Sequence, residues 1–234
     1  MDGQARLVAA LPAALARIQA TPGVYAALWC GSAARGEGNA HSDLDVHALV
    51  TGDHRWRSNF TVKGVPVEVF HNPAHTVRAM FAAGEGDTIT MYAQGRVVLP
   101  HPDLHALTTE ARRLYAAGPT PRPVTQQERH RLIDEVLDAR ALAETGDPLH
   151  VLIACRAASL AVEGWYTARG WWGVKAQGWL PGLTERDPDA AADLRTVLTS
   201  AEAHTRQRAL EALVRRVAGD VSYSDGQSDP QRMP

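Results

Sequence analysis

Residues 31–45 hold the residue types that phosphate and metal chemistry needs. Gly31 and Ser32 follow an apolar stretch, and Asp43-Leu44-Asp45 comes after a ten-residue gap. Gly31 permits close backbone approach to a phosphate. Ser32 can cap a following helical turn and offer its hydroxyl and backbone N–H groups to an anion, and Arg35 adds a guanidinium fork. The stretch therefore predicts a loop that holds phosphates.

The two aspartates predict a metal site beside this loop. Strand side chains alternate, so Asp43 and Asp45 are expected on one face while Leu44 packs into the core. Two close carboxylates are costly unless a cation lies between them, and Mg²⁺ bridges carboxylates to phosphates. Glu68, on a later predicted strand, would complete a site for two Mg²⁺ ions about 3.5–4 Å apart. We interpret Glu68 as a metal ligand, a general base for an acceptor hydroxyl, or both.

Each of these signals is weak alone. Asp-x-Asp is usually a solvated strand edge, Gly-Ser is usually a turn, and a single strand glutamate is usually exposed. Their combination in order favours the catalytic interpretation. The sequence contains no Walker-type or dinucleotide-binding glycine loop, no Gly-x-Ser-x-Gly elbow and no zinc motif, so these other site classes fit worse.

The surrounding pattern predicts an α+β fold, with a mixed β-sheet domain backed by helices and then a C-terminal helical bundle. We expect strands at residues 25–30, 43–50, 57–63, 65–70 and 96–99. Helices are expected at residues 4–20, 73–83, 104–117, 125–144, 148–169, 187–201 and 205–218. Thr125 with Glu128 resembles a capping box at the start of the bundle.

The predicted domain boundaries follow composition. Residues 1–118 form the sheet domain, and residues 119–123 form a stiff proline-rich linker. Residues 124–218 form the helical domain, and residues 219–234 are expected to be a disordered tail.

Charge and hydropathy narrow the class of protein. The formal net charge is −2 and no basic stripe is evident, which counts against long nucleic acids as partners. No apolar run approaches the ~20 residues that span a bilayer, and the N-terminus has no secretory pattern. Cys30 and Cys155 are expected to be buried free thiols in a reducing compartment. We therefore expect a cytoplasmic protein without a membrane segment.

A family resemblance rests on these motifs. Gly31-Ser32, the ten-residue gap, Asp43-Leu44-Asp45 and Glu68 resemble the signature of the DNA polymerase β nucleotidyltransferase superfamily. Ala34-Arg35-Gly36 and Ser42-Asp43 resemble its small bacterial branches, which include aminoglycoside and lincosamide nucleotidyltransferases and the minimal nucleotidyltransferases. The resemblance implies a nucleoside triphosphate with two Mg²⁺ ions, transfer of the nucleoside monophosphate, and release of pyrophosphate. It favours ATP as donor and a small-molecule hydroxyl as acceptor, with antibiotic modification as one role to test.

The site residues follow from the motifs and the resemblance together. Asp43, Asp45 and Glu68 are the expected catalytic metal ligands. The expected nucleotide-binding residues are Gly31, Ser32, Arg35, Ser42 and Lys175.

One lysine and two histidines have a functional and a structural interpretation. Lys175 is one of two lysines in the chain, and it is either a triphosphate contact or a solvated loop residue. His47 lies two residues after Asp45 and could contact a phosphate, although a histidine that fills the sheet edge is favoured. His41 is expected at the surface.

Two groups in the helical half have competing interpretations as well. An aromatic cluster could stack on a base or hold an amine, but helix packing is the commoner role; it comprises Trp165, Tyr166, Trp171, Trp172 and Trp179. Three acids could bind a cationic acceptor, but a solvated helix face is favoured; they are Asp134, Asp138 and Glu163.

Two alternative functions stay open. One is a protein-modifying or antitoxin-type nucleotidyltransferase, whose partner ribonuclease would carry Arg-x(4–6)-His, a motif that residues 124–218 lack. The other is a non-catalytic nucleotide-binding protein, which the three intact acids argue against.

Overall fold

The computed structural model describes residues 3–223, and the chain divides after Pro119 into two compact units. Among the described residues, unit 1 contains the sheet and unit 2 contains helices but no strand. From residue 224 on, the predicted disordered tail lies outside the described residues. Its first part, residues 219–223, is held by Arg129, which donates to the carbonyls of Asp220 at 2.9 Å and Ser222 at 3.3 Å.

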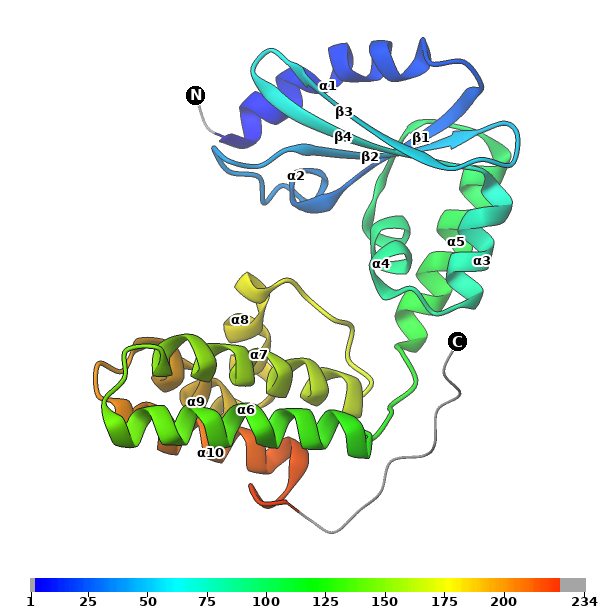
Figure 1. The fold of residues 1–234 in the computed structure, drawn as a ribbon. Helices are drawn as coiled ribbons and strands as arrows, with labels where there is room; N and C mark the ends of the chain where they lie inside the picture. Colours follow the sequence, from blue (N-terminus) through cyan, green and yellow to red (C-terminus); the bar gives the residue numbers. More distant parts are fainter. Residues whose placement is uncertain (1–2, 224–234) are drawn as a thin grey trace. The chain divides into compact units, whose positions relative to one another are not determined.

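The sheet of unit 1 has five strands in the order β3-β4-β2-β1-β5 (Figure 1). The strands are β1 (Val24–Cys30), β2 (Leu44–Val50), β3 (Trp56–Val62), β4 (Val65–Asn72) and β5 (Arg96–Leu99). β2 and β4 run parallel, whereas the other neighbouring pairs run antiparallel. The mixed sheet predicted from the sequence is therefore confirmed.

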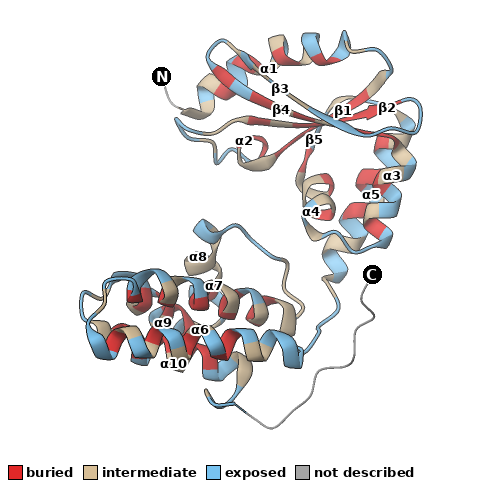
Figure 2. Cartoon of the chain, viewed as in Figure 1, coloured by how far each residue is buried: buried red, intermediate tan, exposed pale blue. Residues whose placement is uncertain are grey.

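One face of this sheet is covered by α1 (Gly3–Gln19). Alternate residues of β2 and β4 pack there against the apolar stripe of α1, which repeats at helical spacing. The buried contributors are Leu7, Ala10, Ala14 and Ile18 from the helix and Leu44, Val46, Ala48, Val65, Val67 and Val69 from these two strands. Figure 2 shows this burial along the strands. The intervening strand residues, including Asp45 and Glu68, consequently lie on the opposite face.

A two-residue turn joins β3 to β4 and sets their register. Lys63 and Gly64 have φ of +50° and +74°, the combination that a type I′ hairpin turn requires. Val62 then pairs with Val65, and Asn59 lies directly opposite Glu68.

Further helices complete unit 1. They are α2 (Gly31–Arg35), α3 (Ala74–Ala82), α4 (Gly86–Gln94) and α5 (Pro102–Ala117). Sequence analysis did not predict α4, which begins at a glycine and has no side-chain cap. Ile89 and Tyr92 of α4 are nevertheless buried, so tertiary packing stabilises a helix with weak local signals.

Unit 2 is a helical bundle, as predicted. Its helices are α6 (Gln126–Thr145), α7 (His150–Ala168), α8 (Trp179–Arg186), α9 (Pro188–Thr199) and α10 (Ala203–Ala218), with a 3₁₀ turn at Ala176–Gly178. The capping box of Thr125 and Glu128 is present at the start of α6. The helix α8 and the 3₁₀ turn were not predicted. No helix among residues 3–223 is both long enough and apolar enough to cross a membrane.

The two cysteines have different environments. Both are free thiols, and Cys30 is buried as predicted. Burial, its main cause, raises the pKa of the Cys30 thiol well above the ordinary value. Cys155 is only partly buried, so that part of the expectation was wrong: Ala154 and Ala158 take the core-facing positions of α7.

Candidate active site

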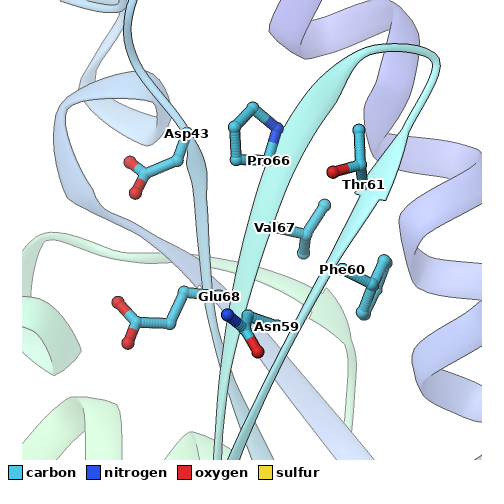
Figure 3. Close-up of a pocket in the computed structure, with 7 residues that line it drawn as sticks. All are labelled: Asp43, Asn59, Phe60, Thr61, Pro66, Val67 and Glu68. Atoms are coloured by element: carbon cyan, nitrogen blue, oxygen red, sulfur yellow. The ribbon is translucent and has the colours of Figure 1, made fainter.

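The sheet register places two of the predicted acids side by side. Asp45 on β2 is the direct partner of Glu68 on the parallel strand β4. Asp43, the first residue of the predicted strand, lies immediately before β2, which begins at Leu44. Asp43 and Glu68 line one open pocket of about 310 Å³, and Figure 3 shows both carboxylates pointing to the same side. The fold thus brings the three acids to one face of the sheet.

Gly31 packs directly against Asp45. Cys30, the residue before it, is the cross-strand partner of Asp45 on β1. The φ of Gly31 is +75°, and a Cβ at this position would overlap the Oδ2 atom of Asp45. Only glycine therefore allows the predicted phosphate loop to meet the aspartate at this distance.

The helix that begins at Gly31 differs from the expectation for Ser32. α2 begins at Gly31, its N-cap residue is Cys30, and no side chain caps it. Ser32 lies inside the first turn, so its predicted capping role was wrong. The helix ends at Arg35 and is capped by Gly36, which has φ of +85° and donates its N–H to the carbonyl of Ala33.

Two side chains of α1 hold the loop between Gly31 and Asp45. Gln4 donates to the carbonyl of Ala33 at 2.9 Å and accepts from the N–H of Gly38 at 2.9 Å. Arg6 donates to the carbonyls of Ala40 at 3.0 Å and Ser42 at 3.3 Å. Sequence reasoning missed both residues, because contacts across about 30 positions leave no local pattern.

Ser42 itself closes this loop. Its hydroxyl accepts from the backbone N–H of Asn39 at 3.0 Å, and the N–H of His41 donates to the Asn39 side chain at 2.8 Å. His41 is exposed, as expected. The contacts of Ser42 in this structure are those of a residue that shapes the loop before Asp43.

The two predicted cationic contacts lie in different units. Arg35 at the end of α2 pairs with Glu37 at 2.8 Å. Such a surface pair contributes only about 0.2–1 kcal/mol, so Arg35 can leave Glu37 at little cost. Lys175 belongs to unit 2, where it is exposed and directly precedes the 3₁₀ turn.

Glu68 has a cationic neighbour that sequence analysis did not identify. The guanidinium of Arg57, on the edge strand β3, lies 3.4 Å from the Glu68 carboxylate and 4.3 Å from the centre of the Phe70 ring. Within residues 3–223 no three His, Cys, Asp or Glu side chains are close enough together to hold a metal ion. Carboxylate oxygens are the ligands that Mg²⁺ prefers, so Asp43, Asp45 and Glu68 have suitable chemistry for this ion. In this structure the Glu68 carboxylate is paired with Arg57 instead.

His47 is buried on the acid-bearing face, two residues after Asp45. It lies on the central strand β2 with 4% of its surface exposed, so the favoured position at a sheet edge was wrong. Its ring stacks on Phe70 at 4.6 Å, and its Nε2 lies 3.2 Å from the sulfur of Met91. Burial, with a smaller contribution from the charge of Arg57, lowers the pKa of His47 to about 4. His47 is therefore neutral at physiological pH and acts as a packing residue beside the acids.

Four of the five aromatic residues in the cluster of unit 2 pack in or against the bundle core, which was the favoured interpretation. Trp165 and Tyr166 are buried in the bundle core, and Trp171 packs against it. The guanidinium of Arg169 lies 4.1 Å from the Trp165 ring centre, and that of Arg186 lies 5.1 Å from the Trp171 ring centre. The chain's own arginines thus occupy ring faces that an amine would otherwise use.

The three acids of the helical half lie on solvated helix faces, as favoured. Asp134, Asp138 and Glu163 are all exposed. Nothing in their burial distinguishes them from ordinary surface acids.

Comparison with known proteins bears on the fold. Neither protein-family models nor curated proteins match this sequence. Among solved structures, the crystal structure of a nucleotidyltransferase-like protein from Exiguobacterium sibiricum is similar, with a TM-score of 0.50 and 12% sequence identity. The match covers 90% of this chain and 76% of that chain. The chain therefore has a nucleotidyltransferase-like fold.

Proposed function

We propose that this chain is a Mg²⁺-dependent nucleotidyltransferase. It would transfer a nucleoside monophosphate, AMP from ATP in the first instance, to a hydroxyl of a small-molecule acceptor and release pyrophosphate. The observation that carries the proposal is the placement of Asp43, Asp45 and Glu68 on one face of a nucleotidyltransferase-like sheet, with Asp45 against Gly31. The free thiols of Cys30 and Cys155 support a cytoplasmic location as part of the proposal.

Each residue then has a defined task. Gly31 and Ser32 supply backbone N–H groups to the triphosphate, and Arg35 exchanges Glu37 for a phosphate oxygen. Asp43, Asp45 and Glu68 would hold two Mg²⁺ ions, which when bound neutralise charge on the phosphates and lower the pKa of a nearby hydroxyl.

The reaction is an in-line displacement at the α-phosphorus. The acceptor oxygen forms a bond to this phosphorus while the bond to the bridging oxygen of pyrophosphate breaks. Glu68 accepts the proton of the acceptor hydroxyl as the bond forms. Because Glu68 lies beside Asp45 across the parallel pair β2–β4, the proton acceptor is held next to the metal-binding acids.

The test is pyrophosphate release with ATP, GTP, CTP and UTP across aminoglycosides, lincosamides and candidate proteins. Glu68→Gln should keep nucleotide binding within about threefold and lower turnover by at least about a hundredfold, since the base is lost. Glu85→Gln, which removes one exposed glutamate of the same unit, is the matched control and should leave both unchanged.

Two results would contradict the proposal. One is a wild-type protein that shows neither Mg²⁺-dependent nucleotide binding nor pyrophosphate release with any acceptor. The other is a Glu68→Gln variant that loses nucleotide binding but keeps its turnover rate.

A further inference from the structure

Glu68 lies between the proposed metal site and a cationic side chain. On one side is β2, which carries Asp45 at the proposed metal site; on the other is β3, which carries Arg57. Arg57 is the register partner of Phe70, two residues after Glu68, so both side chains share the acid-bearing face. The structure therefore has a fixed cation on the side of Glu68 that faces away from Asp45.

Two contacts hold this cation in place. The Nη1 atom of Arg57 lies 3.4 Å from the Oε1 atom of Glu68. The guanidinium also lies over the Phe70 ring at 4.3 Å from its centre, in cation–π geometry. Phe70 is itself stacked on the buried His47, so the platform beneath Arg57 is part of the packed face.

We propose that Arg57 is a positioning residue that competes with a divalent cation for Glu68. Without metal, Arg57 is the counter-ion of Glu68 and draws its carboxylate toward β3. An ion bound by Asp43 and Asp45 replaces Arg57 and recruits Glu68 as the third ligand. The inference rests on the proposed function, because it requires a metal at these acids.

The attraction between Arg57 and Glu68 is weak enough for a metal ion to overcome. The side chains of Arg57 and Glu68 are 67% and 35% exposed, so water screens their attraction. An exposed pair of this kind changes an equilibrium by a factor of roughly 1.5 to 5. A divalent ion with several carboxylate ligands can therefore displace Arg57, at a cost that appears as weaker metal binding.

The experiment measures binding of Mn²⁺ alone, without nucleotide or acceptor, by the electron paramagnetic resonance signal of the free ion. The variants are Arg57→Ala, Glu68→Gln and the double variant. Arg57→Ala should bind Mn²⁺ roughly two- to fivefold more tightly than wild type. In the Glu68→Gln background the same substitution should change the affinity by less than about 1.5-fold, because no carboxylate is left to release.

Arg17→Ala is the matched control. Arg17 is exposed, and its guanidinium lies 4.2 Å from the ring centre of Phe60. Phe60 belongs to β3, the strand that also carries Arg57. It belongs to α1, on the opposite face of the sheet, so its removal should leave Mn²⁺ affinity unchanged. If Arg57→Ala fails to fold, Arg57→Met keeps an apolar stem over Phe70 and replaces it.

Every other outcome overturns the inference. Unchanged affinity in Arg57→Ala refutes the competition while leaving the proposed function intact. An equal gain in the wild-type and Glu68→Gln backgrounds shows general charge repulsion instead. If neither the wild type nor Arg57→Ala binds Mn²⁺, the inference fails together with the metal requirement of the proposed function.

Discussion

Gly31 and Gly36 offer a paired test of the phosphate loop. Gly31 is the first residue of α2, Gly36 directly follows its last residue, and their φ angles are similar and positive, +75° and +85°. A Cβ at Gly36 would meet nothing within 4 Å, whereas a Cβ at Gly31 would overlap the Asp45 carboxylate. Substituting each by alanine therefore adds the same backbone strain but disturbs a proposed metal ligand in only one variant.

The two effects have different sizes. An L-residue in the left-handed region costs about 1–2 kcal/mol, so both variants should lose about that much stability. In Gly31→Ala the Asp45 carboxylate must also move by about 1 Å, and a misplacement of this size costs about a hundredfold in turnover. Gly36→Ala should keep its turnover within about threefold of wild type, because no site group moves.

Urea unfolding and pyrophosphate release measure these two quantities separately, and Mn²⁺ binding reports on Asp45 without any acceptor. The expected pattern is equal loss of stability with unequal loss of turnover and metal binding. If both variants lose turnover to the same extent, backbone strain alone accounts for the loss, and the contact of Gly31 with Asp45 has no catalytic consequence.

Two further predictions concern unit 2. Arg206 is buried and donates to the carbonyl of Val197 at 3.1 Å, so Arg206→Ala should lower the free energy of unfolding by about 3 kcal/mol in urea titration, whereas the exposed Arg208→Ala should change it by less than about 0.5 kcal/mol. The hydrogen bond from Arg122 is the main cause that lowers the pKa of Glu128 from 4.5 to about 2. The Glu128 carboxyl binds its proton less tightly in the folded state than in the unfolded state. The stabilisation of the folded state by ionised Glu128 is therefore present above pH 4.5 and is lost as the pH falls toward 2. The melting temperature of Glu128→Gln should therefore fall less than that of wild type over this interval.

The acid-bearing face could be predicted because its signals are local. Alternation along β2 separates Leu44 from Asp45, and the glycine that begins α2 marks a special backbone position. The hairpin at Gly64 is equally local, since its turn type depends on two residues. These features specify which residues reach the site without knowledge of distant contacts.

The remaining features depend on the assembled sheet. Arg57 meets Glu68 only because β3 and β4 pair in one register, and Gln4 reaches the phosphate loop only when α1 lies on the sheet. His47 was placed at an edge because strand order cannot be read from one strand. Sequence analysis missed α4 for a similar reason: burial of Ile89, rather than its capping or composition, stabilises it.

The turn at Lys63 and Gly64 has a consequence for how this chain can change in length. One residue inserted there would shift β4 by one position, and an apolar valine would then occupy the place of Glu68 opposite Asn59. Residues 51–55, between β2 and β3, are all exposed and lie outside the strands. Insertions that preserve the acids are therefore expected in that loop and not in the hairpin, which makes residues 51–55 the place to graft a peptide tag.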